Sequence, residues 1–241
     1  MHCRRRVHAL LAGAGLQAIM VAAAAPALSV TVATLPDAQR ARRNATNAGA
    51  RQVAAEWLEN RARTCPPMQL AETLTALRGL AAASRDGSAF LEICAWRARH
   101  DTDPLILHTL TMQQAALHLD LGDPKAAGTL LSAYLEHGDL TAPWRSEAAR
   151  AAADVLAARL EQPRQAEGLL AAAMAAVTTN APVPHAELAV ARATLLRDAL
   201  GDLAAAESAY REVLSRGAAC PAPSCAAAVD GLASLLMASG R

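Results

Sequence analysis

Three segments of the chain align with one another without gaps, at steps of 39 and 40 residues. They begin at Gly122, Glu161 and Gly201. Each has an alanine five residues after its first position and a bulky residue four positions further on. These positions are Ala127, Ala166 and Ala206, then Leu131, Leu170 and Tyr210. Residues four apart lie on one face of a helix, so each segment is predicted to be a helix whose small residue lets a neighbouring helix approach closely.

The residues around the start of each segment predict a tight turn between two helices. Gly122 and Gly201 permit the left-handed conformation that ends a helix, and Asp123 and Asp202 can cap the next one. Leucines upstream of the turns also align, namely Leu117, Leu156 and Leu196, then Leu121, Leu160 and Leu200. Each repeat unit is therefore expected to be a helix, a turn and a second helix.

The composition predicts helices in the rest of the chain as well. Hydrophobic residues make up 53%, much of it alanine, and aromatics only 2%, a composition that favours helices over strands. We predict an all-α fold, with one solenoid running from residue 37 to residue 241. Its hairpin units are expected at about 68–100, 105–136, 144–177 and 185–216, followed by a cap helix at 226–240.

The turn glycine, the small residue and the bulky residue resemble the tetratricopeptide (TPR) family, most closely in the third unit, at Gly201, Ala206 and Tyr210. The family repeat is about 34 residues long, and its first-helix signature of Trp, Leu, Gly and Tyr is largely missing here. The resemblance implies a right-handed α-solenoid of antiparallel helix hairpins with a groove lined by first-helix residues. Carried over residue by residue, this partner-binding groove is Thr109, Met112, Ala116, Asp120, Ala148, Ala151, Val155, Arg159, Leu188, Ala191, Leu195 and Asp198. Such a lining suits an extended or helical apolar segment of a partner protein, unless tight packing occludes the groove.

The N-terminus has the organisation of a secretory signal peptide, predicted at residues 1–27. Arg4 to Arg6 precede an apolar stretch, Ala25-Pro26-Ala27 offers a cleavage site, and no acidic residue occurs before Asp37. An uncleaved membrane anchor and a mitochondrial presequence are alternatives. Residues 28–36 are expected to be a short flexible segment. The chain is therefore predicted to be periplasmic or secreted, with no integral membrane span after signal cleavage.

Export bears on the cysteines, because disulfides persist in oxidising compartments. Cys65, Cys94, Cys220 and Cys225 remain after cleavage. Cys220 and Cys225 flank a proline-rich turn, and we predict a disulfide between them. Half of a zinc site and two free thiols are the alternatives. Cys65 and Cys94 are expected at different levels of one hairpin, and the sequence leaves their pairing open.

No motif predicts catalysis, a cofactor or a metal: the sequence has no His-Glu-x-x-His, no Gly-x-Ser-x-Gly and no phosphate-binding glycine loop in its body. Without Arg4 to Arg6 the chain has 20 basic and 22 acidic residues, a net charge of −2, which gives no footprint for nucleic acid. We read Arg40, Arg42 and Arg43 as a solvated helix face. The expected function is a non-enzymatic protein-binding adaptor or scaffold in the bacterial cell envelope. The alternatives are a helical accessory module of a cell-wall enzyme, or a cytoplasmic TPR-type regulator if the N-terminus is not a signal.

Overall fold

A computed structural model describes residues 48–137, 139–177, 181–217 and 220–238 of the chain, and this part is all-α, as predicted. The predicted signal peptide, the segment 28–36 and the basic cluster at 40–43 lie outside the described residues. The described helices fall into two compact units, unit 1 up to Asp101 and unit 2 from Thr102. A single solenoid across both units stays a prediction, and each unit is described by itself.

Unit 1 is formed by three mutually packed helices, α3 (Ala48–Thr64), α4 (Pro67–Ser84) and α5 (Ser88–His100). Its largest fully buried side chains are Leu58, Leu70, Leu74, Phe90 and Ile93. The buried Arg97 of α5 donates hydrogen bonds to the carbonyl oxygens of Arg63 (2.8 Å) and Cys65 (3.1 Å). Carbonyls at the C-terminus of a helix have no partner within it, so Arg97 fastens the end of α3 to α5.

The two cysteines of unit 1 belong to its interior. Cys65 and Cys94 are both buried and remain thiols, so the structure does not pair them in a disulfide. Cysteine behaves as a small apolar residue in such surroundings.

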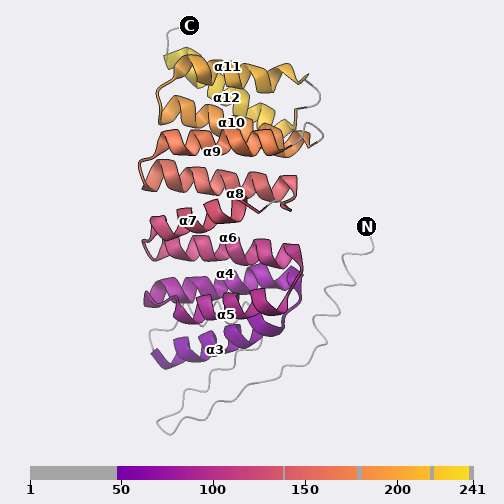
Figure 1. The fold of residues 1–241 in the computed structure, drawn as a ribbon. Helices are drawn as coiled ribbons and strands as arrows, with labels where there is room; N and C mark the ends of the chain where they lie inside the picture. The colour runs from indigo at the N-terminus through magenta and orange to yellow at the C-terminus, as the bar shows by residue number, and fades with distance from the viewer. Residues whose placement is uncertain (1–47, 138, 178–180, 218–219, 239–241) are drawn as a thin grey trace, which may run out of the picture. The chain divides into compact units, whose positions relative to one another are not determined.

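Unit 2 contains helices that pack in chain order, each against the next (Figure 1). The first helix of each pair is α6 (Pro104–Asp120), α8 (Ala142–Asp154) and α10 (Pro182–Asp198). The second helix is α7 (Pro124–Leu135), α9 (Pro163–Ala176) and α11 (Leu203–Ser215). After α11 comes α12 (Ala222–Ala238), and α10 also contacts both α8 and α12. The packing of adjacent, similar helices makes unit 2 resemble a helical repeat.

The turns between paired helices use the residues that the repeat singles out. Gly122 (φ 82°) and Gly201 (φ 66°) adopt the left-handed conformation. The Asp123 and Asp202 side chains accept hydrogen bonds from the amides of Ala126 and Ala205 at 2.9 Å and cap the following helices.

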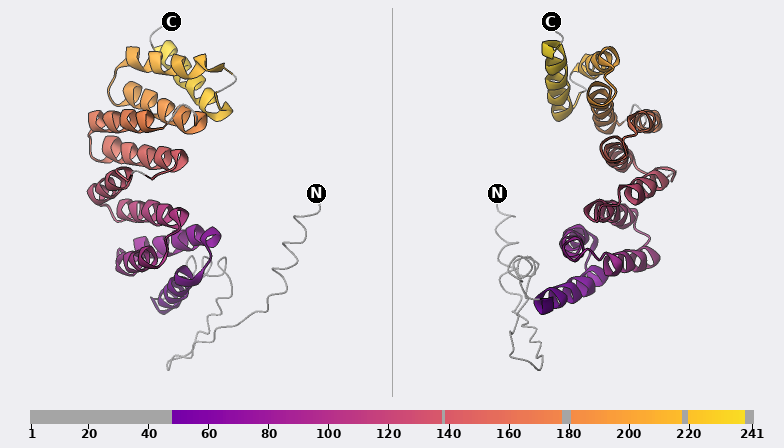
Figure 2. Two further views of the ribbon diagram at one scale, coloured as in Figure 1. Left: turned by 45° about the vertical axis from the view of Figure 1, so that its right-hand side comes forward. Right: turned by 90° about the vertical axis from the view of Figure 1, so that its left-hand side faces the viewer.

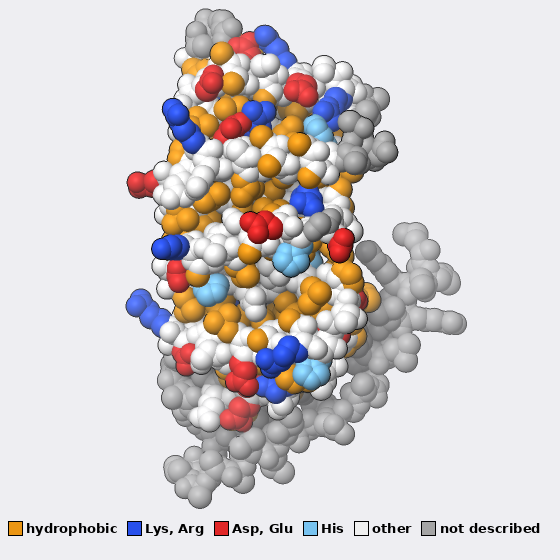
Figure 3. Space-filling model, in the orientation of Figure 1, with side chains coloured by type: hydrophobic (Ala, Val, Ile, Leu, Met, Phe, Trp, Pro, Cys, Tyr) orange, Lys and Arg blue, Asp and Glu red, His pale blue; other side chains and the backbone are white. Residues whose placement is uncertain are grey.

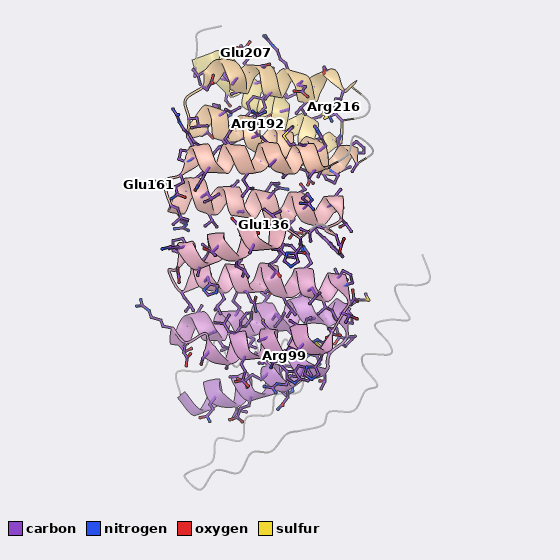
Figure 4. All side chains as sticks on the ribbon, viewed as in Figure 1. Arg99, Glu136, Glu161, Arg192, Glu207 and Arg216 are labelled. Carbon is purple, nitrogen blue, oxygen red and sulfur yellow. A yellow bond between two sulfur atoms is a disulfide. The ribbon has the colours of Figure 1, made fainter. Side chains whose placement is uncertain are left out.

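The second of these turns departs from the other two. Glu161 has φ 56°, a conformation that costs a residue with a Cβ roughly 1–2 kcal/mol. The turn before it is π-helical (η1, Val155–Arg159), with the Leu160 amide bonded to the Val155 carbonyl. Figure 4 shows Glu161 at the edge of unit 2, between α8 and α9. The sequence predicted the turn here but gave no sign of the π-helical geometry.

The positions shared by the three repeats form the core of unit 2. Ala127, Ala166 and Ala206 have no exposed surface, and Leu131, Leu170 and Tyr210 have at most 1%. The buried alanines agree with the close approach of a neighbouring helix that the repeat predicts. Small residues that close one helix onto the next, with large residues one turn further on, therefore explain the aligned pattern.

The last described helix is held by a disulfide at its start. Cys220 and Cys225 are bonded, with Cα atoms 5.9 Å apart, which confirms the predicted pairing and leaves neither sulfur available for zinc. Helix α12 begins at Ala222, earlier than the predicted residue 226, because Pro223 is tolerated in a first helical turn. Figure 2 shows α12 beside α10 and α11.

Candidate partner-binding face

The groove predicted from the TPR resemblance maps to α6, α8 with η1, and α10; we call this surface of unit 2 the first-helix face. Three of its predicted residues, Ala148, Val155 and Leu188, are at most 3% exposed. Val155 and Leu188 belong to apolar clusters of the core. A side chain in that position cannot touch a partner docked on the surface, so at these three positions packing occludes the predicted groove.

The other predicted residues retain exposed surface. Thr109, Met112, Ala116, Ala151, Ala191 and Leu195 are half-buried, and Asp120, Arg159 and Asp198 are exposed. Met112, Ala151 and Ala191 each lie ten residues before their turn residue, and all three also pack against the core. The first-helix face thus offers mostly apolar side chains along the middle of its helices and charged ones where the helices end.

Asp198 is one of these charged residues, and its neighbour Arg197 controls its chemistry. The Arg197 guanidinium donates hydrogen bonds of 2.6 and 2.9 Å to the two carboxylate oxygens. These bonds favour the ionised carboxylate and hold the pKa of Asp198 below its ordinary value of 3.8. The carboxylate therefore stays charged, but both of its oxygens already accept hydrogen bonds from Arg197 of the same chain.

Polar contacts join consecutive first helices at the opposite end of the face. His108, Glu147 and Glu187 each lie fourteen residues before a turn residue. His108 Nε2 lies 3.1 Å from Glu147 Oε2, which joins α6 to α8. The hydroxyl of Ser146 donates to Glu187 Oε2 at 3.1 Å, and Arg150 Nη1 lies 3.4 Å from the same oxygen, which joins α8 to α10. The His108–Glu147 contact therefore joins two residues at the same repeat position, whereas Ser146 lies one residue before the position equivalent to Glu187.

His108 is buried and stands at the centre of a cluster of polar and aromatic side chains in unit 2. Its Nδ1 lies 3.0 Å from the hydroxyl of Tyr134, and its ring stacks on Trp144 with centroids 5.3 Å apart. A neutral imidazole satisfies both contacts by donating from Nε2 to the Glu147 carboxylate and accepting at Nδ1 from the Tyr134 hydroxyl. Burial, and then the Glu147 charge, raise the pKa of Tyr134, so the phenol stays protonated and is a poor nucleophile. The cluster is best explained as a satisfied polar network that fixes how α6, α7 and α8 meet.

The sequence predicted a solvent-facing or turn position for His108, which the structure buries, and assigned no role to Tyr134, Trp144 or Glu147. The available signal was the spacing: 39 residues separate His108 from Glu147, the same step that separates the first two repeats. Two polar residues at one repeat position are predicted neighbours when consecutive first helices pack together.

A surface pocket of about 270 Å³ lies where α7, α8 and α9 meet. It is lined by Ser132, Leu135, Glu136, Arg145, Leu169, Ala172 and Ala173. Arg145 donates hydrogen bonds to the carbonyls of Leu135 (3.0 Å) and His137 (3.2 Å), so its guanidinium closes the C-terminus of α7. None of the predicted groove residues lines this pocket, which is smaller than most sites that hold a drug-sized ligand.

Charged side chains of both signs are scattered among apolar ones on the face displayed in Figure 3. Within the part of the chain that the structure describes, no group of three or more His, Cys, Asp or Glu side chains is placed to hold a metal ion. Among the described helices, none has the combined length and hydrophobicity needed to cross a membrane.

Comparison of the chain with protein-family models, with curated proteins and with solved structures finds no match.

Proposed function

We propose that the chain is a non-catalytic adaptor of the helical-repeat type, which binds a segment of a partner protein on the first-helix face of unit 2. The finer architecture that we propose is a right-handed, TPR-like solenoid of helix hairpins. A contact between equivalent residues of consecutive repeats carries this proposal. His108 meets Glu147, one repeat step of 39 residues away, as expected when similar supersecondary units stack on one another. Ser146 and Glu187 join the next two first helices, one residue out of register.

The chemistry of the face favours an apolar segment as the bound element. Met112, Ala151 and Ala191 are half-exposed at the same repeat position and offer apolar side chains, two of them small, that a partner's apolar residues can contact. The polar contacts on one side of this row and the exposed Asp120 and Arg159 on the other provide a rim that fixes orientation.

We propose that the protein works outside the cytoplasm, in the bacterial cell envelope. The order of Arg4 to Arg6, the apolar stretch and the Ala-Pro-Ala site supports export, and the disulfide suits an oxidising compartment. Mass spectrometry of the mature N-terminus tests this location. A mature chain that begins near Leu28 supports export, and intact Met1 on cytoplasmic protein contradicts it.

Site-specific photocrosslinking tests the binding face. A photoreactive amino acid at Met112, Ala151 or Ala191, in cells that produce the protein, is expected to give one common adduct. Matched controls carry the same probe in the second helices, at the equivalent and exposed positions Thr129, Gly168 and Ser208. Circular dichroism melts verify that each variant is folded. Adducts from the second-helix positions alone, or none from folded first-helix variants, would contradict the proposed face.

A further inference from the structure

Helix α12 is held on unit 2 by a small apolar contact. Its buried residues are Ser224, Ala228, Gly231 and Leu235, of which only Leu235 has a large side chain, and the half-buried Cys225 and Leu232 also pack against the core. Arg197 Nη1 donates a hydrogen bond of 3.3 Å to the Gly231 carbonyl. Glycine within a helix also lowers helix stability by about 1 kcal/mol relative to alanine. The free energy that holds α12 against α10 and α11 is therefore expected to be small, unless another feature limits the conformations of the undocked helix.

The disulfide is placed to supply that restriction. Cys220 belongs to the apolar cluster formed with Tyr210 and Val213 of α11, and Cys225 lies in the first turn of α12. The bond thus fixes the first turn of the helix against a residue that is itself anchored in the core. On the loop-entropy account, closing so short a loop disfavours the undocked conformations by roughly 40-fold.

We propose that the Cys220–Cys225 pair is a redox latch: the disulfide keeps α12 docked, and its reduction releases α12 from α10 and α11. Release uncovers Tyr210, which has no exposed surface when α12 is docked. The inference depends on the described contacts of unit 2 and not on the proposed partner.

The chemistry of opening is an exchange with a dithiol reductant. One thiolate of the dithiol attacks the sulfur of Cys225, the more exposed of the pair, and the S–S bond breaks. The Cys220 sulfur leaves as a thiolate and takes up a proton. The second thiol of the reductant then attacks the mixed disulfide, frees Cys225 as a thiol and closes the reductant into its own disulfide. Two electrons and two protons pass to the protein, and closing is the reverse exchange with a disulfide-bearing oxidant.

Hydrogen exchange on the full-length protein tests the latch. Oxidised protein is compared with protein reduced by dithiothreitol, with thiol counting to verify that two further thiols have appeared. Amide exchange within residues 226–237 is expected to accelerate roughly 40-fold on reduction. Exchange within Pro124–Leu135 of α7 should not change, which makes this helix the internal control.

Two variants separate the missing bond from the effect of the reagent. Cys220→Ser with Cys225→Ser, and the corresponding pair of alanine substitutions, should both exchange like the reduced wild type, with or without dithiothreitol. Reoxidation of the wild type should restore protection of α12. Unchanged protection of α12 after verified reduction would overturn the latch, as would equal acceleration in α7 and α12 or a failure to recover on reoxidation.

Discussion

Substitution of Gly231 by alanine tests how α12 is held. A Cβ atom at Gly231 would lie 2.6 Å from Tyr210 Cε1 and 2.7 Å from its hydroxyl oxygen, and closer still to Cζ. The ring has little freedom to move away, because Tyr210 is fully buried and its hydroxyl lies 3.0 Å from Thr194 Oγ1. The Arg197 guanidinium also covers the ring, 6.0 Å from its centroid.

Two opposing effects decide the outcome of Gly231→Ala. Alanine is the better helix former by about 1 kcal/mol. Overpacking a filled core costs about 1–3 kcal/mol, and a backbone-proximal clash with a pinned ring belongs at the upper end of that range. The net result expected is a loss of about 2 kcal/mol, and a fall in Tm of about 4–8 °C for a chain of this length.

Urea and thermal unfolding followed by circular dichroism measure this loss, and Gly168→Ala is the matched control. Gly168 lies within α9, is exposed, and has no atom within 4 Å of the position that a Cβ would take. That variant should gain up to about 1 kcal/mol from helix propensity alone. If Gly231→Ala is as stabilising as Gly168→Ala, Tyr210 does not pack on the α12 backbone. Combining Gly231→Ala with Tyr210→Leu should cost less than the sum of the two single changes, because the ring that clashes is gone.

Three further predictions concern the turns and contacts of unit 2. Glu161→Gly should raise the free energy of unfolding by about 0.5–1 kcal/mol, because glycine adopts the left-handed conformation without strain, whereas Glu161→Ala should give no such gain in the same melts. A double-mutant cycle of His108→Gln and Glu147→Gln should show a coupling of about 0.5–3 kcal/mol in urea unfolding, and a coupling of zero would mean that their contact contributes nothing. The pKa of Asp198 is lowered in the folded state, so its pair with Arg197 stabilises the fold above the ordinary value of 3.8 and loses this effect as the pH falls below it. Since Asp198 is more than half exposed and screened by solvent, Asp198→Asn should cost at most about 1 kcal/mol at pH 7. This cost should shrink as the pH falls below 3.8, measured as Tm against pH.

The repeated residues allowed much of unit 2 to be predicted from the sequence. Gly122 and Gly201 turn as expected, and the aligned alanines and the bulky residues one turn further on are buried, because helix geometry links residue spacing directly to the face that packs. The same logic located the second turn, although Glu161 stands where the other repeats have glycine. It did not predict η1, since a π-helical turn depends on how the end of α8 fits its neighbours rather than on local propensity.

The exposure of the predicted groove residues was harder to predict from the sequence. Its residues came from a family whose repeat is about 34 residues long, whereas the steps here are 39 and 40 residues. Whether a given first-helix position faces solvent depends on how consecutive first helices cross, and this is a tertiary property. Val155 and Leu188 are therefore buried in the core, while Met112 and Leu195 keep part of their surface exposed.

The contact of Tyr210 with Gly231 indicates that the repeat pattern concerns pairs of facing residues, whose side-chain volumes compensate for one another. Leu131 and Tyr210 occupy the same position of their repeats, nine residues after the turn glycine. Leu131 shares an apolar cluster with Ala152, which lies nine residues before Glu161, and Gly231 lies at the corresponding place before Gly240. The larger ring thus faces the smaller partner, as close packing requires when the spacing between helices is similar. At this position the first repeat therefore has leucine with alanine, and the third has tyrosine against glycine, where a Cβ would meet the ring.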